Sequence, residues 1–167
     1  MRVLRAPAVI RRGDPVLEGQ WTTEVVAPVL VHHLLPVVGA WATEVAARGH
    51  SSGYVPRAGL PLPVARIGTT LARRVQAARP VGCTVHNGVP LGWHRDRLAP
   101  RDTWNVTLVL RDEASSSTAG LLVVGTTAYV MDHGAYVHFD NQVWHGVTAF
   151  DTERETRVSC TFYVPAP

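Results

Sequence analysis

The spacing of apolar residues along the chain changes near position 80. Before it, apolar side chains recur three and four residues apart, as they do in helices that bury one face. This pattern predicts a helix over 21–48, interrupted at Pro28 and Pro36, and a second helix over 64–78. The intervening segment 51–63 is crowded with Gly and Pro, so a loop is expected there.

Beyond position 80, apolar residues alternate with polar ones, which is the period of a β-strand. The strands expected from this alternation cover 82–86, 104–111, 120–124, 128–131, 135–139, 145–150 and 157–164. Because no helix separates them, they favour a β-sandwich or barrel, and the expected fold class is mainly β with N-terminal helices. The 167 residues suit a single domain, with a helical part over 1–79 and a β core over 80–167.

The composition suits a soluble globule and argues against several classes of protein. Hydrophobic residues make up 46% of the chain, yet no stretch approaches the roughly 18 consecutive apolar residues of a membrane span. The net charge of +3 is spread out, without the interleaved aromatics of a nucleic-acid platform. No signal-peptide pattern is present, and Cys83 and Cys160 lie in apolar runs typical of buried thiols in a reducing compartment. We therefore expect a cytoplasmic protein that contacts neither a membrane nor a nucleic acid; the sequence predicts no oligomeric state.

The main candidate for chemistry is His94-Arg95-Asp96, followed later by His145. Residues i and i+2 of an extended segment point the same way, so His94 and Asp96 can reach one metal ion while Arg95 turns away. Two imidazoles and one carboxylate are the ligands of the facial triad that holds non-haem Fe(II) and leaves coordination positions open. The triad closes only if the strand that begins at His145 returns beside the segment of His94.

Arg157 and Ser159 share one face of the last predicted strand. We expect this strand to be an antiparallel neighbour of the strand of His145. An arginine fork binds a carboxylate bidentately, and a serine hydroxyl can donate to the same group, so the pair suits a dicarboxylate co-substrate. Asn105 and Thr107 share a face of an earlier strand, and they either line the pocket of this co-substrate or belong to ordinary core.

In this order and spacing, the residues resemble the Fe(II)/2-oxoglutarate-dependent oxygenases, whose double-stranded β-helix (jelly-roll) core carries H-x-D, a later His and R-x-S. The matching residues are His94, Asp96 and His145, and then Arg157-Val158-Ser159. The segment 87–93 also resembles the family's polar, Gly-rich approach to the metal ligands. The chain departs from the family at 119–121, where Ala and Leu stand in place of Gly and an acidic residue. The resemblance covers about 80–165.

The resemblance implies an enzyme that uses Fe(II), 2-oxoglutarate and O2. The metal ligands would be His94, Asp96 and His145, with Arg157 and Ser159 binding the far carboxylate of 2-oxoglutarate. Such an enzyme converts 2-oxoglutarate to succinate and CO2 while it hydroxylates an unactivated C–H bond, here of a small molecule, an amino acid or a peptide. Halogenases of this family have a small residue in place of the carboxylate ligand, so Asp96 favours hydroxylation.

Two other functions use the same residues differently. A cupin-like metal protein would use the ligands without 2-oxoglutarate, but the H-x-H and following glutamate usual in cupins are absent, and Arg157 would have no role. A β-barrel binding module without catalysis would not require the intact ligand set. A second H-x-D, His138-Phe139-Asp140, is a weaker candidate than the first because it lies too close to His145 to match the order of the family.

Residues around the motif leave the substrate open. Trp93 and Trp144 each adjoin a proposed ligand and serve either as packing or as a substrate wall. His86 and His133 are expected to be structural or to lie outside the ligand set. Three nearby arginines would suit an anionic substrate, although exposed arginines are common: Arg95, Arg97 and Arg101.

Overall fold

A computed structural model of the chain describes residues 8–10, 22–25, 34–48, 52–87, 91–97, 99–111, 120–149 and 157–166. The part of the first expected helix between 26 and 33 lies outside the described residues, as does Ala119, one of the positions at which the chain departs from the family.

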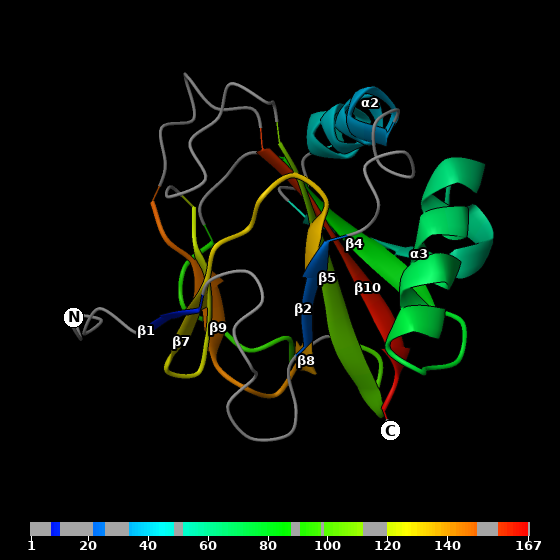
Figure 1. The fold of residues 1–167 in the computed structure, drawn as a ribbon. Coiled ribbons are helices and arrows are strands. Elements are labelled where there is room, and N and C mark those ends of the chain that lie inside the picture. The colour runs from blue at the N-terminus through cyan, green and yellow to red at the C-terminus, as the bar shows by residue number, and fades with distance from the viewer. Residues whose placement is uncertain are drawn as a thin grey trace.

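The described strands form two sheets (Figure 1). The larger, here the major sheet, contains in spatial order β2 (Thr22–Val25), β8 (Ala135–Asp140), β5 (Thr103–Arg111), β10 (Arg157–Pro165), β4 (Gly82–Asn87) and β3 (Ser52–Pro56), with all neighbours antiparallel. The smaller, here the minor sheet, contains β1 (Ala8–Ile10), β7 (Thr127–Tyr129), β6 (Leu122–Val124) and β9 (His145–Val147). Only β1 and β7 are parallel among these described pairs.

The structure has three layers: two helices, the major sheet and the minor sheet (Figure 1). Helices α2 (Leu34–Ala47) and α3 (Leu62–Arg74) cover one face of the major sheet, where buried residues of both helices pack with those of the central strands. The other face looks toward the minor sheet across a second apolar cluster that includes Val109, Leu122 and Phe139. Because side chains alternate along a strand, β5 and β8 each supply residues to both clusters. Among the described residues, no helix is long and apolar enough to span a membrane.

The seven strands expected after position 80 are all present, with shifted ends. The helix expected over 64–78 is also present, as α3, although it ends at Arg74. In the longer strands β4, β5 and β10 the helix-facing residues are apolar at every second position, so the period of these strands is encoded locally.

The prediction of a helix over 21–48 is wrong in its first part. Thr22–Val25 is strand β2, which pairs with β8, and the described helix begins only at Leu34. Three of the four residues of β2 are β-branched, which suits a strand, and the pairing with β8 is a tertiary interaction that local spacing does not report. Pro36 does not interrupt α2, because it lies in the first turn, where backbone N–H groups have no partner within the helix.

The prediction of a loop over 51–63 is also wrong. Ser52–Pro56 forms β3, the edge strand of the major sheet beside β4, and a short 3-10 turn, η1 (Arg57–Gly59), follows it. Proline is tolerated at the end of an edge strand because a missing N–H there breaks no ladder. This strand carries Tyr54 to one side of the candidate site.

Candidate metal centre

The two histidines of the motif come from segments far apart in sequence that pair through their backbones. His94 N–H donates to the carbonyl of His145, and His145 N–H donates to the carbonyl of His94, both at 2.9 Å. Gly146 allows the close approach, because a Cβ there would lie 3.0 Å from the carbonyl oxygen of Leu91. The expectation that the strand of His145 returns beside His94 is therefore confirmed.

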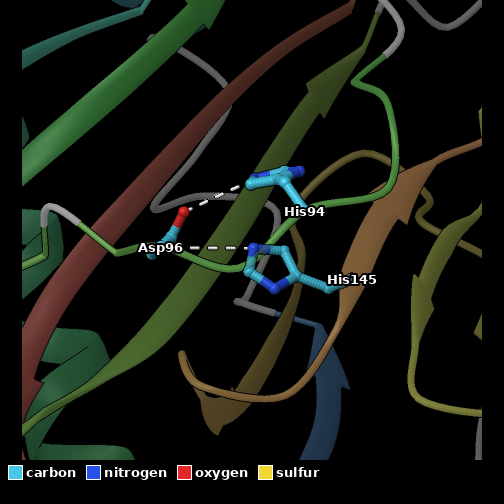
Figure 2. Close-up of side chains that lie close together, drawn as sticks. All are labelled: His94, Asp96 and His145. Carbon is cyan, nitrogen blue, oxygen red and sulfur yellow. Dashed lines mark ion pairs between the residues drawn. The ribbon is translucent and has the colours of Figure 1, made fainter.

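The side chains of His94, Asp96 and His145 converge (Figure 2). Their candidate ligand atoms all lie within 4.8 Å of one another. The Nε2 atom of His94 is 3.4 Å from one carboxylate oxygen of Asp96, and the Nε2 atom of His145 is 3.6 Å from the other. Among the described residues, this is the only group of three or more His, Cys, Asp or Glu side chains close enough to hold a metal ion.

Neighbouring groups fix the orientation of each candidate ligand. The Nδ1 atom of His94 lies 2.6 Å from the carbonyl oxygen of Gly92, and that of His145 lies 2.8 Å from the carbonyl oxygen of Val143. A carbonyl only accepts, so both Nδ1 atoms carry the proton, and each Nε2 faces the site as a lone-pair donor. The side-chain amide of Asn105 donates to Asp96 at 2.6 Å. Such outer hydrogen bonds orient the ligands of protein metal sites.

The electrostatics of the group match this geometry. Burial alone would raise the pKa of Asp96, but its contacts with the side chains of His145, His94 and Asn105 outweigh it and lower that pKa well below its usual range. The same contact with Asp96 raises the pKa of His94. Burial lowers the pKa of the nearby His86 to about 4. The carboxylate is thus ionised at neutral pH, as a metal ligand must be.

Arg157, Ser159 and Thr107 lie behind the triad. Together with all three candidate ligands they line a narrow space, here the inner cleft. Arg157 and Ser159 are 2% and 3% exposed, so this cation is held within the protein. The hydroxyl of Thr107 hydrogen-bonds that of Thr161 at 3.0 Å. Asn105 is not among the residues that line the inner cleft. Its amide instead donates to Asp96.

The expectation that Arg157 lies on a strand adjacent to that of His145 is wrong. Strand β10 lies between β5 and β4 in the major sheet, whereas β9 pairs with β6 in the minor sheet. Arg157 therefore faces the site from the opposite wall. Because the two sheets face each other, side chains from β9 and β10 can meet across the interior although the two strands are not adjacent in one sheet.

A larger space, here the outer cavity, opens in front of the triad with a volume of about 580 Å³. It shares five lining residues with the inner cleft: His86, Leu91, His94, Asp96 and Tyr163. Its remaining lining residues are Tyr54, Thr84, Gly92, Trp93, Arg95, Arg97 and Ala99. The triad thus lies between an open cavity and a buried cationic cleft, an arrangement that can hold two organic molecules near one metal ion.

The second H-x-D motif does not reach this centre. Its His138 packs beside Trp104 on the helix-facing side of β8, with ring centroids 5.1 Å apart. Phe139, between the two polar residues, instead faces the site and contacts the ring of His145 edge-on at 4.9 Å. Outside the ligand set, the Nδ1 atom of His133 accepts a hydrogen bond from the backbone N–H of Arg111.

Several residues near the site were not singled out by the sequence. The polar alternation of β10 continues past Ser159 to Thr161 and Tyr163, which also line the inner cleft, and this alternation was a usable signal. Arg111, buried directly opposite Arg157 on β5, follows the same face as Thr107. Tyr54 had no such signal, because its strand was expected to be a loop.

Comparisons with solved structures confirm the fold. A prolyl-4-hydroxylase from Pseudomonas putida superposes with a TM-score of 0.53 and 16% identity, covering 89% of this chain and 93% of that one. AviO1 from Streptomyces viridochromogenes gives 0.52 and 16% over 89% and 93%. The non-haem monooxygenase ThoJ, solved as a nickel complex, gives 0.57 and 12% over 84% and 71%. The chain therefore shares its fold with these three proteins.

The double-stranded β-helix core expected from the motif is therefore present, and the resemblance stated from H-x-D…H…R-x-S extends from sequence pattern to fold. No protein-family model matches the sequence, and no curated protein matches it significantly. At identities of 12–16% these solved structures indicate neither a substrate nor a reaction outcome for this chain.

Proposed function

We propose that the chain is an Fe(II)- and 2-oxoglutarate-dependent dioxygenase that hydroxylates an unactivated C–H bond of a small molecule, amino acid or peptide, with conversion of 2-oxoglutarate to succinate and CO2. The observation that carries the proposal is the convergence of His94, Asp96 and His145, whose ligand atoms lie within 4.8 Å of one another. The shared fold and the buried Arg157 beside the triad support it.

The donor set fits iron. Two neutral imidazole nitrogens and one carboxylate match the facial triad of non-haem Fe(II). The histidines donate from Nδ1 to the carbonyls of Gly92 and Val143, and Asn105 donates to Asp96, which leaves the ligand atoms turned inward. When bound, Fe(II) supplies the oxygen and redox chemistry that side chains lack. The part of the protein is to hold three coordination positions and leave the others to small molecules.

Arg157 and Ser159 would bind the far carboxylate of 2-oxoglutarate. A buried guanidinium pairs with a carboxylate more strongly than an exposed one, because water competes less for both groups. The hydroxyls of Thr107 and Thr161 add polar contacts along the same cleft. The outer cavity, on the far side of the triad, would receive the substrate.

The test uses anaerobic protein with Fe(II) and 2-oxoglutarate. We expect a weak visible metal-to-ligand charge-transfer band, followed in air by substrate-stimulated formation of succinate. Asp96→Ala should lose the band through loss of the metal. Asp140→Ala, in the second H-x-D motif, is the matched control and should keep it, because Asp140 lies outside the triad and caps the backbone N–H of Gln142.

Other outcomes separate the alternatives. Metal binding that needs Asp96 but gives no band with 2-oxoglutarate would point to a cupin-like metal protein. No metal binding in the wild type would point to a binding module without catalysis. Retention of the band in His145→Ala would show that the triad is assigned wrongly.

A further inference from the structure

Two arginine side chains line the outer cavity. Arg95 and Arg97 both line its volume of about 580 Å³, and both are exposed. Among the described residues that line it, the only acid is Asp96. The Asp96 carboxylate is turned toward the two histidines and, under the proposed function, is a metal ligand. The cavity therefore offers guanidinium groups to a ligand without an acidic group that would repel an anion.

Neither arginine is neutralised within the described part of the chain. No ion pair joins the side chain of Arg95 or Arg97 to a described acid. Arg95 instead lies over the ring of Trp144, 5.0 Å from its centroid. This cation–π contact does not neutralise the guanidinium, because the ring of Trp144 carries no net charge.

Aromatic rings also line the cavity, and two of them are exposed. Trp93 is 40% exposed and Tyr54 49%. Trp93 stacks on Trp144 with centroids 6.3 Å apart and planes 9° from parallel, so Trp144 contacts both Trp93 and Arg95. These contacts restrict Trp93 and Arg95 before any ligand arrives, which lowers the entropy lost on binding.

The position of the Tyr54 ring depends on a glycine beside it, whose missing side chain leaves room for the ring. Its ring lies against Gly82 of β4, where a Cβ would approach the ring within 2.5 Å. The ring of Tyr163, the next aromatic residue inward, is 5.8 Å away between centroids. Exposed rings held in fixed positions beside unpaired guanidinium groups suit a ligand that is both planar and negatively charged.

We propose that the outer cavity binds a small molecule that carries an aromatic ring and an anionic group, with the ring against Trp93 or Tyr54 and the anion on Arg95 and Arg97. The assignment rests on the proposed function in one respect, that this ligand is the substrate. The binding preference itself follows from the charges and rings of the cavity and is measured without turnover.

The experiment titrates three probes of similar size into Mn(II)-loaded protein with saturating 2-oxoglutarate, using calorimetry. The probes are benzenesulfonate, neutral benzenesulfonamide and cyclohexanesulfonate; sulfonates are chosen because they are poor metal ligands. Benzenesulfonate should bind roughly five- to tenfold more tightly than the sulfonamide, as expected for a charge-assisted contact at a partly exposed site. It should bind roughly threefold or more tightly than cyclohexanesulfonate, which lacks a planar ring.

Variants locate the preference. Arg97→Gln and Arg95→Gln should each reduce the ratio of sulfonate to sulfonamide affinity severalfold. Arg101→Gln is the matched control, because Arg101 is exposed on the same segment but lines a different cavity. Equal affinity for the charged and neutral probes, an equal effect of Arg101→Gln, or no binding of benzenesulfonate at millimolar concentration would each overturn the proposal.

The charge-transfer band is recorded on the same protein with Fe(II). A band without preference for the anionic aromatic probe overturns this inference and leaves the proposed function standing. A preference for that probe without a band does the reverse: the cavity then binds planar anions in a protein that is not a 2-oxoglutarate-dependent oxygenase.

Discussion

Strand β10 turns one set of side chains toward the helices and another toward the space between the sheets, and both sets are buried. Toward the helices it presents Val158, Cys160, Phe162 and Val164, and toward the site Arg157, Ser159, Thr161 and Tyr163. Burial of apolar surface stabilises the fold, whereas burial of polar groups costs free energy unless they find partners. Burial therefore has opposite effects on the two faces: burial of the apolar face stabilises the fold, whereas burial of the polar face costs stability and, under the proposed function, places binding groups beside the triad.

The polar face offsets part of that cost with hydrogen bonds between strands. The hydroxyl of Thr161 pairs with that of Thr107 at 3.0 Å, and the hydroxyl of Tyr163 pairs with that of Thr84 at 2.9 Å. These bonds also fix the walls of the inner cleft. A strand that supplies both faces places binding groups on a rigid element, which is more precise than a site built on loops.

The largest expected effect lies on the helix-facing side. Phe162→Ala removes a fully buried ring from the cluster between β10 and the helices, and it should lower the free energy of unfolding by about 3–5 kcal/mol. Thr161→Val, the adjacent residue on the site face, keeps its shape and should cost only about 1 kcal/mol through the lost hydroxyl pair. Urea unfolding of the two variants measures the contrast, and equal losses would contradict it.

The second prediction concerns pH and the polar face of β4. Burial lowers the pKa of His86 to about 4, below the ordinary histidine value of 6.5 expected in the unfolded chain. Between these values the unfolded chain binds more protons, so the stability of the metal-free protein should fall as pH drops from about 6.5 to 4, by about 3 kcal/mol in total.

His86→Gln isolates this contribution. The variant should lose the part of the pH dependence in that window that is due to His86; burial also lowers the pKa of His138, which leaves a smaller dependence of the same sign. The lowered pKa of Asp96 acts below the ordinary range of a carboxyl group, and the raised pKa of His94 acts above 6.5 in the opposite sense. An unchanged slope of unfolding free energy against pH in His86→Gln would assign the dependence to other groups.

The third prediction tests the buried cation on the site face. Arg157→Gln should lower the affinity for 2-oxoglutarate by roughly 10- to 100-fold, because a charge-assisted bidentate contact is replaced by a neutral one. The affinity for Fe(II) alone should change little, because the metal ligands are untouched. Titration of the charge-transfer band with 2-oxoglutarate gives both values. A parallel loss of metal affinity would mean that Arg157 supports the triad and does not anchor the co-substrate.

The two faces also explain which parts of the fold could be predicted from the sequence. Alternation along β5, β8 and β10 revealed the strands because each face has its own neighbours and the period is local. The partners of a strand are not written in its own pattern. The prediction that β9 and β10 are neighbours was therefore wrong, and the segment of β2 was predicted to be helix.

The site divides in the same way. The grouping of the triad was predictable because its three residues occur in the expected order and spacing, and the structure brings His94, Asp96 and His145 together. The walls of the outer cavity were not predictable as a set. Tyr54 reaches the cavity only through the pairing of β3 with β4, and Trp93 meets Trp144 only through the backbone pairing of His94 with His145.

The smallest expected effect compares two glycines of the helical layer. A Cβ on Gly68 of α3 would lie 2.6 Å from the ring of Phe162, so Gly68→Ala should force the helix from the sheet and cost about 1–2 kcal/mol. Gly39 of α2 has no atom within 4 Å of the same position. Gly39→Ala should therefore stabilise the protein by about 0.5–1 kcal/mol, because alanine loses less backbone entropy in a helix. If the apolar face of β10 sets the distance between α3 and the major sheet, thermal unfolding should show a lower melting temperature for Gly68→Ala and a higher one for Gly39→Ala. A stabilising Gly68→Ala would show that this layer has room to move, and the rigid support inferred for the site face would then need another source.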